Sequence, residues 1–301
     1  MKPKVSVVTP CYNSENYIRP YLDSLLAQTY TNLEVILVDD GSEDATAAII
    51  EAYAERFAQK GITCRYIYQE HKNQAWAVNN GLKYVTGAYL IWPDSDDILE
   101  PTSVEKRVAY LQCHPEEGMV RNDRYYIDAA TGKRYNGKPD AFKTKKRLFY
   151  DLFFERCTVC CGTYMIRMAC FDEINPSREI LIGHGGQNYQ LLLPMAYRFL
   201  CGFVDEQLYG VVVHADSHSL QQRTYAQAKD RMDSLLWICD SILRELPVPE
   251  EERQILMKIK TNHCYKILDG RYRIRVRHLL RTVRANFYSL RYRKIWEQDY
   301  E

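Results

Sequence analysis

The densest group of side chains that could do chemistry is acidic. Asp94, Ser95, Asp96 and Asp97 follow directly after an apolar run that ends at Pro93. Carboxylates two residues apart on a turn can converge on one divalent cation. Mg²⁺ or Mn²⁺ held in this way completes its coordination shell with the phosphate oxygens of a substrate, such as a nucleoside diphosphate. An isolated Asp-x-Asp is more often a solvated acidic loop, so its position in the fold has to decide between the two interpretations.

Polar residues also follow two other strand-like runs. Residues 5–9 precede Pro10, Cys11, Tyr12 and Asn13, and residues 33–38 precede Asp39 and Asp40. Open α/β sheets bind ligands beyond the carboxyl ends of their strands, so we expect these residues and the acidic group at one edge of a sheet. Neither G-x-G-x-x-G after the first strand nor G-x-x-x-x-G-K-[ST] is present. A metal is therefore the predicted counter-charge for phosphate.

The elements that must position these residues alternate between strands and helices. Apolar runs predict strands at 5–9, 33–38, 65–68 and 88–92, and helical spacing predicts helices at about 15–28, 44–59 and 74–85. This alternation favours a mainly parallel sheet with helices on its faces. From about residue 225 the pattern changes to long helices, interrupted at Pro247 and Pro249. We expect an α/β domain over residues 1–222 and a helical, basic C-terminal extension over residues 223–301.

Composition excludes several classes of protein. The chain has 301 residues, 40 Lys and Arg against 39 Asp and Glu, a net charge of +1, 46% hydrophobic residues and a mean hydropathy of −0.42. These values exclude intrinsic disorder as the main state and remove the whole-molecule argument for nucleic-acid binding. No apolar run approaches the roughly 18–20 residues of a membrane span, so we expect a cytoplasmic protein.

Ten cysteines raise the question of disulfides or a metal site. Only Cys157, Cys160 and Cys161 cluster, and no second Cys or His pair lies at zinc-finger spacing. In a reducing cytosol such residues behave as small hydrophobic side chains. We expect buried free thiols.

Together these motifs resemble the family 2 inverting glycosyltransferases of the GT-A fold, of the bacterial polysaccharide type. The matching segments are VSVVTPCYNSENYIRPYLDSLLAQTYTNLEVILVDDGSEDAT (5–46), HKNQAWAVNNGLKYVTGAYLIWPDSDD (71–97) and, more weakly, GGQNYQLLLP (185–194). The resemblance covers roughly the first 220 residues. It implies a GT-A sheet flanked by helices. It also implies transfer of a hexosyl or N-acetylhexosaminyl group from a nucleotide-diphosphate donor, a UDP-sugar first of all, to a glycan or lipid-linked acceptor.

The resemblance assigns roles to individual residues. An aromatic ring offers a stacking face and a carboxylate accepts from a uracil imide, which also suits Tyr12 and Asp40 to a nucleoside on chemical grounds. By resemblance, the donor is bound by Pro10, Tyr12, Asn13, Asp40, Lys72, Asn79, Asp94 and Ser95, and Mg²⁺ or Mn²⁺ is bound by Asp94, Asp96 and His214. His218 is a second candidate for the role of His214, because both lie in the segment VVVHADSHS (211–219).

The sequence departs from the family at the catalytic base. Inverting transfer is an in-line displacement in which a metal stabilises the leaving diphosphate and a carboxylate takes the acceptor proton. Many family members carry Glu-Asp at the start of a helix, where this chain has Gln187 and Asn188, and amides are not general bases at neutral pH. Three explanations stay open. His184, Asp123 or Asp172 substitutes as the base, or the amides orient the acceptor and the base lies elsewhere, or the protein no longer transfers sugar.

Residues 266–296 are rich in Arg, Lys and aromatic side chains. A basic, aromatic helix can lie peripherally on the anionic inner face of the cell membrane, and the alternative is a helix packed on the catalytic domain. No nucleic-acid-binding motif accompanies the charge. Two rival functions are a catalytically inactive nucleotide-sugar binding protein and a sugar-1-phosphate nucleotidyltransferase. The latter should carry a Gly-rich basic loop where this chain has TPCYNSE.

Overall fold

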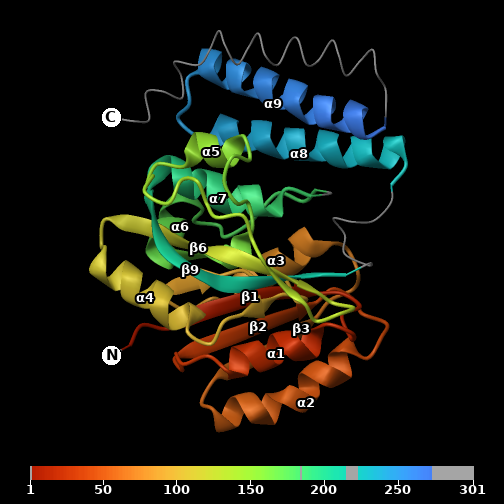
Figure 1. Ribbon diagram of the computed structural model, residues 1–301, viewed down its shortest axis with the longest axis vertical. Coiled ribbons are helices and arrows are strands. Elements are labelled where there is room, and N and C mark those ends of the chain that lie inside the picture. Colours follow the sequence, from red (N-terminus) through yellow and green to blue (C-terminus); the bar gives the residue numbers. More distant parts are fainter. Residues whose placement is uncertain (1, 184, 215–222, 273–301) are drawn as a thin grey trace.

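The structure, a computed structural model, describes residues 2–183, 185–214 and 223–272. Within these residues one sheet of nine strands crosses the molecule in the order β3-β2-β1-β4-β8-β6-β9-β5, with β7 paired to β6. Helices α1 and α2 lie at one end of the molecule and α8 and α9 lie at the other (Figure 1).

The first four strands pair in parallel, as the sequence predicts. They are β1 (Val5–Cys11), β2 (Leu33–Asp39), β3 (Thr63–Tyr68) and β4 (Tyr89–Ile91). Side chains alternate between the two faces of a strand. In β1, Val7 packs with helices α1 (Ile18–Leu26) and α2 (Thr46–Gln59), whereas Val8 packs with α3 (Gln74–Leu82) on the other face. Both faces are therefore covered, and the polar residues that follow the strands lie at one edge of the sheet.

Beyond β4 the sheet is mixed. Strand β8 (Tyr164–Arg167) runs antiparallel to both β4 and β6 (Glu117–Asp128), and β6 runs parallel to β9 (Leu200–Val213). Two short strands, β5 (Ile98–Leu99) and β7 (Arg134–Asn136), add antiparallel pairs. The connecting helices are α4 (Ser103–Cys113), α5 (Phe149–Phe153), the 3-10 turn η1 (Cys161–Thr163), α6 (Met168–Ile174) and α7 (Gln187–Arg198).

The helical C-terminal region is present as α8 (Tyr225–Glu245) and α9 (Glu250–Arg271). Leu243 of α8 and Leu256 of α9 belong to the same buried core as Leu192 of α7. Lys260 of α9 is fully buried and contacts Glu155 and Tyr189. The core is thus continuous from α7 into α8 and α9. The boundary that we place at residue 222 falls outside the described residues and stays a prediction.

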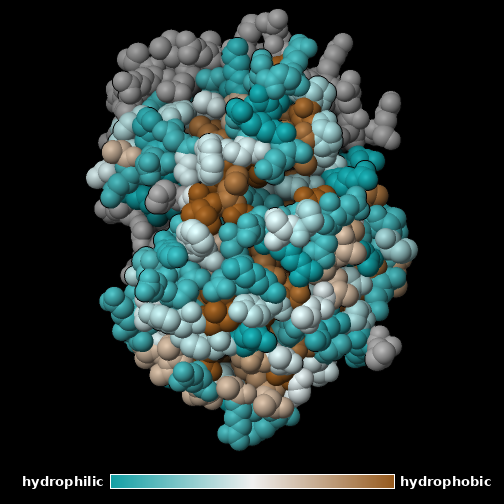
Figure 2. Space-filling view, turned by 180° about the vertical axis from the view of Figure 1, so that it is seen from behind, coloured by the Kyte–Doolittle hydropathy of each residue, from teal (hydrophilic) through white to brown (hydrophobic). Residues whose placement is uncertain are grey.

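The surface and the cysteines are those of a globular protein. Seen from behind, hydrophobic residues appear in small separate areas among hydrophilic ones (Figure 2). None of the helices in the described part of the chain is long and apolar enough to cross a membrane.

All ten cysteines are free, and only Cys113 is exposed. Burial raises the pKa of Cys160 and Cys161, so these thiols stay protonated and apolar.

One buried carboxylate fastens the parallel strands together. Glu34 of β2 accepts hydrogen bonds from the Ser6 hydroxyl of β1, from the backbone and hydroxyl of Thr86 (2.6 Å each), and from the Gly87 N–H (3.0 Å) just before β4. Burial by itself would raise the pKa of Glu34, but the hydrogen bonds from Ser6 and Thr86 outweigh it and lower the pKa. The carboxylate therefore joins three strands whose far ends form the site described below.

We expect Glu34→Gln to lower the free energy of unfolding at pH 7 by about 1–3 kcal/mol, because it removes charge-assisted hydrogen bonds. A carboxylate whose pKa is lowered by folding stabilises the protein above its unfolded pKa of about 4.3, and this contribution is lost as the pH falls through the folded pKa. The difference from wild type should therefore shrink between pH 7 and pH 3 in urea unfolding. Glu51→Gln, on the exposed face of α2, is the control and should change little. A difference that does not vary with pH would contradict this account.

Candidate active site

The acidic turn directly follows β4, at the carboxyl edge of the sheet. The backbone N–H of Asp94 donates to the Tyr209 hydroxyl (3.3 Å), and Oδ1 of Asp94 accepts from Nε2 of Gln74 at the start of α3 (3.2 Å). Burial, and secondly the negative charge of Asp96, raise the pKa of Asp94 to about 7. Burial and the neighbouring carboxylate thus disfavour the ionised form of Asp94.

Asp96 lies against His214, which is 118 residues away in sequence. The two groups approach to 2.8 Å between Nε2 of His214 and Oδ2 of Asp96. The imidazole is also stacked on Tyr17, with ring centroids 3.8 Å apart and planes tilted by 25°. The structure therefore brings together Asp96 and His214, two of the three residues that the resemblance names as metal-binding, and Asp94 lies two residues before Asp96 in the same turn. His218 lies outside the described residues.

Asp97 faces the protein rather than the edge. Its side chain is buried, and Oδ1 accepts the backbone N–H of Val212 in β9 (2.9 Å). Burial, followed by the charges of Asp94 and Asp96, raises the pKa of Asp97 well above its ordinary value. Asp97 thus holds the end of β9, and with it His214, beside the turn. The sequence carries no signal that separates Asp97 from its acidic neighbours.

Ser95 joins the acidic turn to the loop after β1. Its hydroxyl lies 3.1 Å from the hydroxyl of Ser14, and the Ser14 N–H donates to Thr46 of α2 (2.7 Å). In the same loop Asn13 adopts a left-handed conformation with φ of 45°. The Asn13 N–H donates to Ser42, and its side-chain oxygen accepts from the Glu43 N–H, both at 2.9 Å. These contacts link the loops after β1 and β2 to the acidic turn.

Asp40 is the buried carboxylate of the predicted nucleoside site. Its Oδ1 accepts from Nε2 of Gln69 (2.6 Å) and from the backbone N–H of Lys72 (3.1 Å). Its Oδ2 lies 2.9 Å from Nδ1 of His71. The ring of His71 stacks on Tyr12 at 4.2 Å between centroids. Tyr12, Asp40 and Lys72 are therefore neighbours, as expected from the sequence, whereas Gln69 and His71 have roles that sequence reasoning missed.

Two further predicted donor-binding residues, Pro10 and Asn79, make structural contacts within the protein. Pro10 is a buried residue of β1, paired in register with Val38 of β2. Asn79 of α3 exchanges two hydrogen bonds with the backbone of Ile180, at 2.9 Å from Nδ2 to the carbonyl oxygen and 2.8 Å from the N–H to Oδ1. These bonds hold the segment that leads to α7 against α3. Direct contacts of Pro10 and Asn79 with a donor stay predictions.

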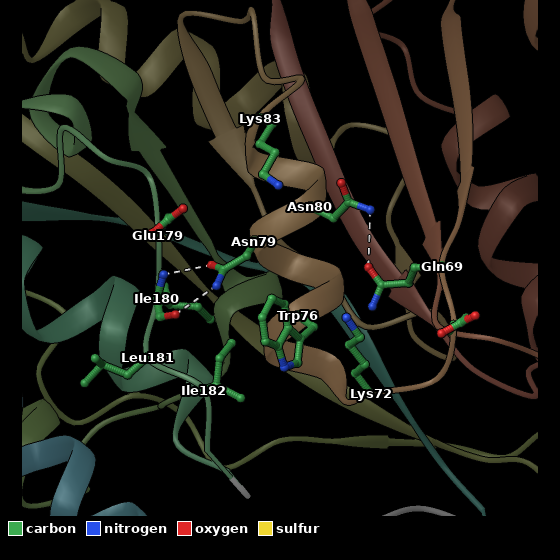
Figure 3. Close-up of a pocket in the computed structure, with 11 residues that line it drawn as sticks. Gln69, Lys72, Trp76, Asn79, Asn80, Lys83, Glu179, Ile180, Leu181 and Ile182 are labelled. Carbon is green, nitrogen blue, oxygen red and sulfur yellow. Dashed lines mark hydrogen bonds between the residues drawn. The ribbon is translucent and has the colours of Figure 1, made fainter.

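An open groove of about 630 Å³ runs along the outer face of α3, beside the Asp40 site (Figure 3). Lys72 lies over the Trp76 ring in the groove, 4.7 Å from its centroid, and Nδ2 of Asn80 donates to Gln69 (3.3 Å). The lining residues are Gln69, Glu70, Lys72, Trp76, Asn79, Asn80, Lys83, Glu179, Ile180, Leu181 and Ile182. Gln69 and Lys72 therefore form the wall shared by the groove and the Asp40 site.

Helix α7 begins at the amides that replace the expected Glu-Asp. Gly186 supplies the left-handed residue before it (φ of 79°), and the side-chain amide of Asn188 donates to the Val159 carbonyl oxygen (3.4 Å). His184 lies outside the described residues. Both carboxylate oxygens of Asp172 accept from Arg178, at 2.6 and 2.8 Å. Asp123 accepts the Asp140 N–H (3.0 Å) and forms an ion pair with Lys143 (3.4 Å). Both carboxylates thus have structural partners.

The donor set fits a divalent cation in its chemistry. In the part of the chain that the structure describes, His214 is the only basic side chain that forms an ion pair with Asp94, Asp96 or Asp97. Asp94 and Asp96 thus lie in one turn with a single imidazole against Asp96, and a cation would offset the charge of Asp96, which after burial is the second cause of the raised pKa of Asp94. No group of three or more His, Cys, Asp or Glu side chains is arranged around a common metal position among these residues. Asp96 and His214 are the pair already in contact.

The mixed sheet, its flanking helices and the acidic turn after β4 define a GT-A type α/β fold. A family model described as "Glycosyl transferase family 2" matches residues 6–174, more than half of the chain, and the chain belongs to this family. It is 32% identical over 179 residues to an uncharacterized glycosyltransferase of Rickettsia prowazekii (strain Madrid E), with 57% of this chain and 54% of that protein covered. The chain thus spans about half the length of that relative.

Two solved structures share the fold. A crystal structure of S. aureus TarS 1-349 in complex with UDP-GlcNAc has a TM-score of 0.64 and 21% identity, covering 86% of this chain and 72% of that one. The mannosyltransferase PcManGT from Pyrobaculum calidifontis, in complex with GDP-Man and Mn²⁺, has a TM-score of 0.58 and 19% identity, covering 89% and 70%. At this level of identity the likeness concerns the fold.

We expect Asp97→Ala to lower the free energy of unfolding by about 1–3 kcal/mol, because the Val212 N–H loses its acceptor. Asp97→Asn keeps an oxygen for this hydrogen bond and should stay within about 1 kcal/mol of wild type. Urea unfolding of the three proteins without ligand at pH 7 measures both effects. Equal losses in the two variants would show that the charge of Asp97, rather than its hydrogen bond, matters.

Proposed function

We propose that the protein transfers a sugar, with inversion, from a nucleotide-diphosphate donor, first of all a UDP-sugar, to a glycan or lipid-linked acceptor. The observation that carries this proposal is the contact of His214 with Asp96, in the turn that also holds Asp94, at the same sheet edge as Tyr12 and Asp40. Membership of glycosyl transferase family 2 supports it. TarS and PcManGT, which share the fold, were solved with UDP-GlcNAc and with GDP-Man and Mn²⁺.

Each end of the donor has a matching set of side chains. At the nucleoside end, Tyr12 in the loop after β1 is a residue 41% exposed whose ring now stacks on His71, and Asp40 is an acceptor for a ring N–H. At the diphosphate end, Asp94, Asp96 and His214 are the residues that would hold Mg²⁺ or Mn²⁺. Bound there, the ion would supply electrostatic stabilisation for the charge of the leaving diphosphate. Ser95 fixes the turn that carries both carboxylates.

For the acceptor we propose that His184 is the general base and that Gln187 and Asn188 orient the sugar. The two carboxylates considered as substitutes, Asp123 and Asp172, already hold Lys143 and Arg178. An imidazole titrates near neutral pH, as a general base requires. The alternative, a nucleotide-sugar binding protein without catalysis, keeps every donor contact and lacks only this step. Turnover with and without acceptor therefore separates the two functions.

We expect Asp96→Asn and His184→Gln to fail in different ways. Asp96→Asn should lower Mn²⁺-dependent UDP affinity at least tenfold, because it removes a charged ligand. His184→Gln should keep UDP affinity and lose UDP release in the presence of acceptor. Calorimetry with UDP and MnCl₂ gives the affinity, and a UDP-release assay gives turnover. Asp230→Asn, on the exposed surface of α8, is the control. Wild-type UDP affinity in Asp96→Asn would refute the metal assignment.

We also propose that the basic segment 266–296 holds the protein on anionic membranes, a proposal that rests on its composition. Removal of residues 273–301 keeps the whole of α9. The shortened chain should therefore fold but sediment less with vesicles of phosphatidylglycerol and phosphatidylcholine than the full chain does. Vesicles of phosphatidylcholine alone are the control. Equal sedimentation of the two chains with the anionic vesicles would end this proposal.

A further inference from the structure

His71 already makes the two contacts that a nucleobase needs at the Asp40 site. Its ring stacks on Tyr12 with centroids 4.2 Å apart and planes tilted by 19°, and its Nδ1 lies 2.9 Å from Oδ2 of Asp40. We propose that the His71 side chain occupies the nucleobase position before the nucleotide binds and has to leave it for binding to proceed. His71 would thus set the donor affinity. This inference rests on the proposed function.

The hydrogen bonding of His71 identifies the atom that imitates the base. Nδ1 lies 3.0 Å from the backbone carbonyl oxygen of Asp40 as well as 2.9 Å from its Oδ2. A carbonyl oxygen and a carboxylate oxygen both accept, so Nδ1 carries the hydrogen. The Nδ1–H of a stacked imidazole is a hydrogen-bond donor, as is the ring N–H of uracil. Both are donors that lie in the plane of a flat ring whose face can cover Tyr12.

Burial shows which contact must give way. The Asp40 side chain is only 4% exposed, whereas the His71 side chain is 51% exposed. The other two donors to Asp40 are Gln69 and the Lys72 backbone, and both bind Oδ1. Oδ2 could accept a second hydrogen bond. The Asp40 side chain is buried, however, so a ligand cannot reach Oδ2 while His71 stays in place. A base can reach Oδ2 and the covered face of Tyr12 when the exposed imidazole turns away.

The backbone around His71 is fixed, so the movement is confined to its side chain. Gly41 has φ of +77°, and a Cβ atom there would lie 2.6 Å from the backbone nitrogen of His71. The loop after β2, which holds Gly41, and the loop after β3, which holds His71, therefore pack closely at this point. On the other side, the Lys72 N–H is bonded to Asp40 and the Lys72 ammonium lies over Trp76 (Figure 3). Rotation about the side-chain bonds of His71 leaves these contacts intact.

The consequence for affinity follows from competition. If only a fraction of molecules have His71 turned away, the observed dissociation constant equals the intrinsic constant divided by that fraction. A partly exposed imidazole–carboxylate contact contributes up to about 1 kcal/mol, which corresponds to an affinity change of up to about fivefold. Removal of the imidazole should therefore increase the affinity for UDP. If His71 instead helped to hold the nucleobase, removal of the imidazole would lower the affinity for UDP.

The test is calorimetry with UDP and MnCl₂ on wild type, His71→Ala and His114→Ala. His114 is the matched control, because it stacks on Tyr110 with almost the same geometry (4.1 Å, 13°) on and directly after α4. We expect His71→Ala to bind UDP about three- to fivefold more tightly than wild type and His114→Ala to bind it equally. Equal or weaker binding by His71→Ala, while wild type binds UDP, would overturn this inference and leave the proposed function intact. Failure of all three proteins to bind UDP would overturn both.

A second measurement follows the wild-type protein itself. NMR signals of the His71 ring, assigned by their absence in His71→Ala or in His71→Gln, report whether the ring lies on Tyr12. Addition of UDP and MgCl₂, which is diamagnetic, should move these signals away from their ring-current-shifted positions and leave those of His114 unchanged. Unchanged His71 signals at saturating UDP would contradict displacement.

Discussion

Negative charge gathered at the carboxyl edge of the sheet is the constraint on which the site depends. Asp94 and Asp96 follow a buried strand, and Asp97 is held in place by β9 rather than by a cation from the protein. Burial of the turn, and secondly the charge of Asp96, raise the pKa of Asp94. The fold tolerates this because Tyr209 and Val212 donate hydrogen bonds to Asp97 and Gln74 donates one to Asp94. A cation bound at this turn would stabilise the folded state, because it would offset the negative charge gathered there.

Much of the first half of the fold could be predicted because its signals are local. The apolar runs at 5–9 and 33–38 lie in strands β1 and β2, and the acidic turn follows β4 as the pattern indicated. A short run of apolar residues identifies such strands without any knowledge of the strands with which they pair. The family resemblance, too, is concentrated in these segments. Tyr12, Asp40 and Lys72 consequently lie together, as the sequence suggested.

The second half resisted prediction because its contacts join distant residues. The antiparallel strand β8 enters between β4 and β6, and the sequence gives no period that reveals this order. The contact between His214 and Asp96 spans 118 residues. The hydrogen bonds of Asn79 to Ile180 span 101 residues and give a donor-site candidate a structural task. Burial of one of the three carboxylates of the turn, that of Asp97, is likewise decided by tertiary packing.

The continuous core between α7 and the C-terminal helices bears on how the chain can be divided. The family match ends at residue 174, yet α7 and β9, with His214 directly after β9, come later in the chain. Leu243 and Leu256 belong to the same buried core as Leu192 of α7, and the buried ammonium of Lys260 reaches Glu155 next to α5. A fusion or truncation designed on the borders of the family match would therefore cut through a single packing unit. Exchanging α7 between relatives therefore requires α8 and α9, which share its core, to be exchanged with it.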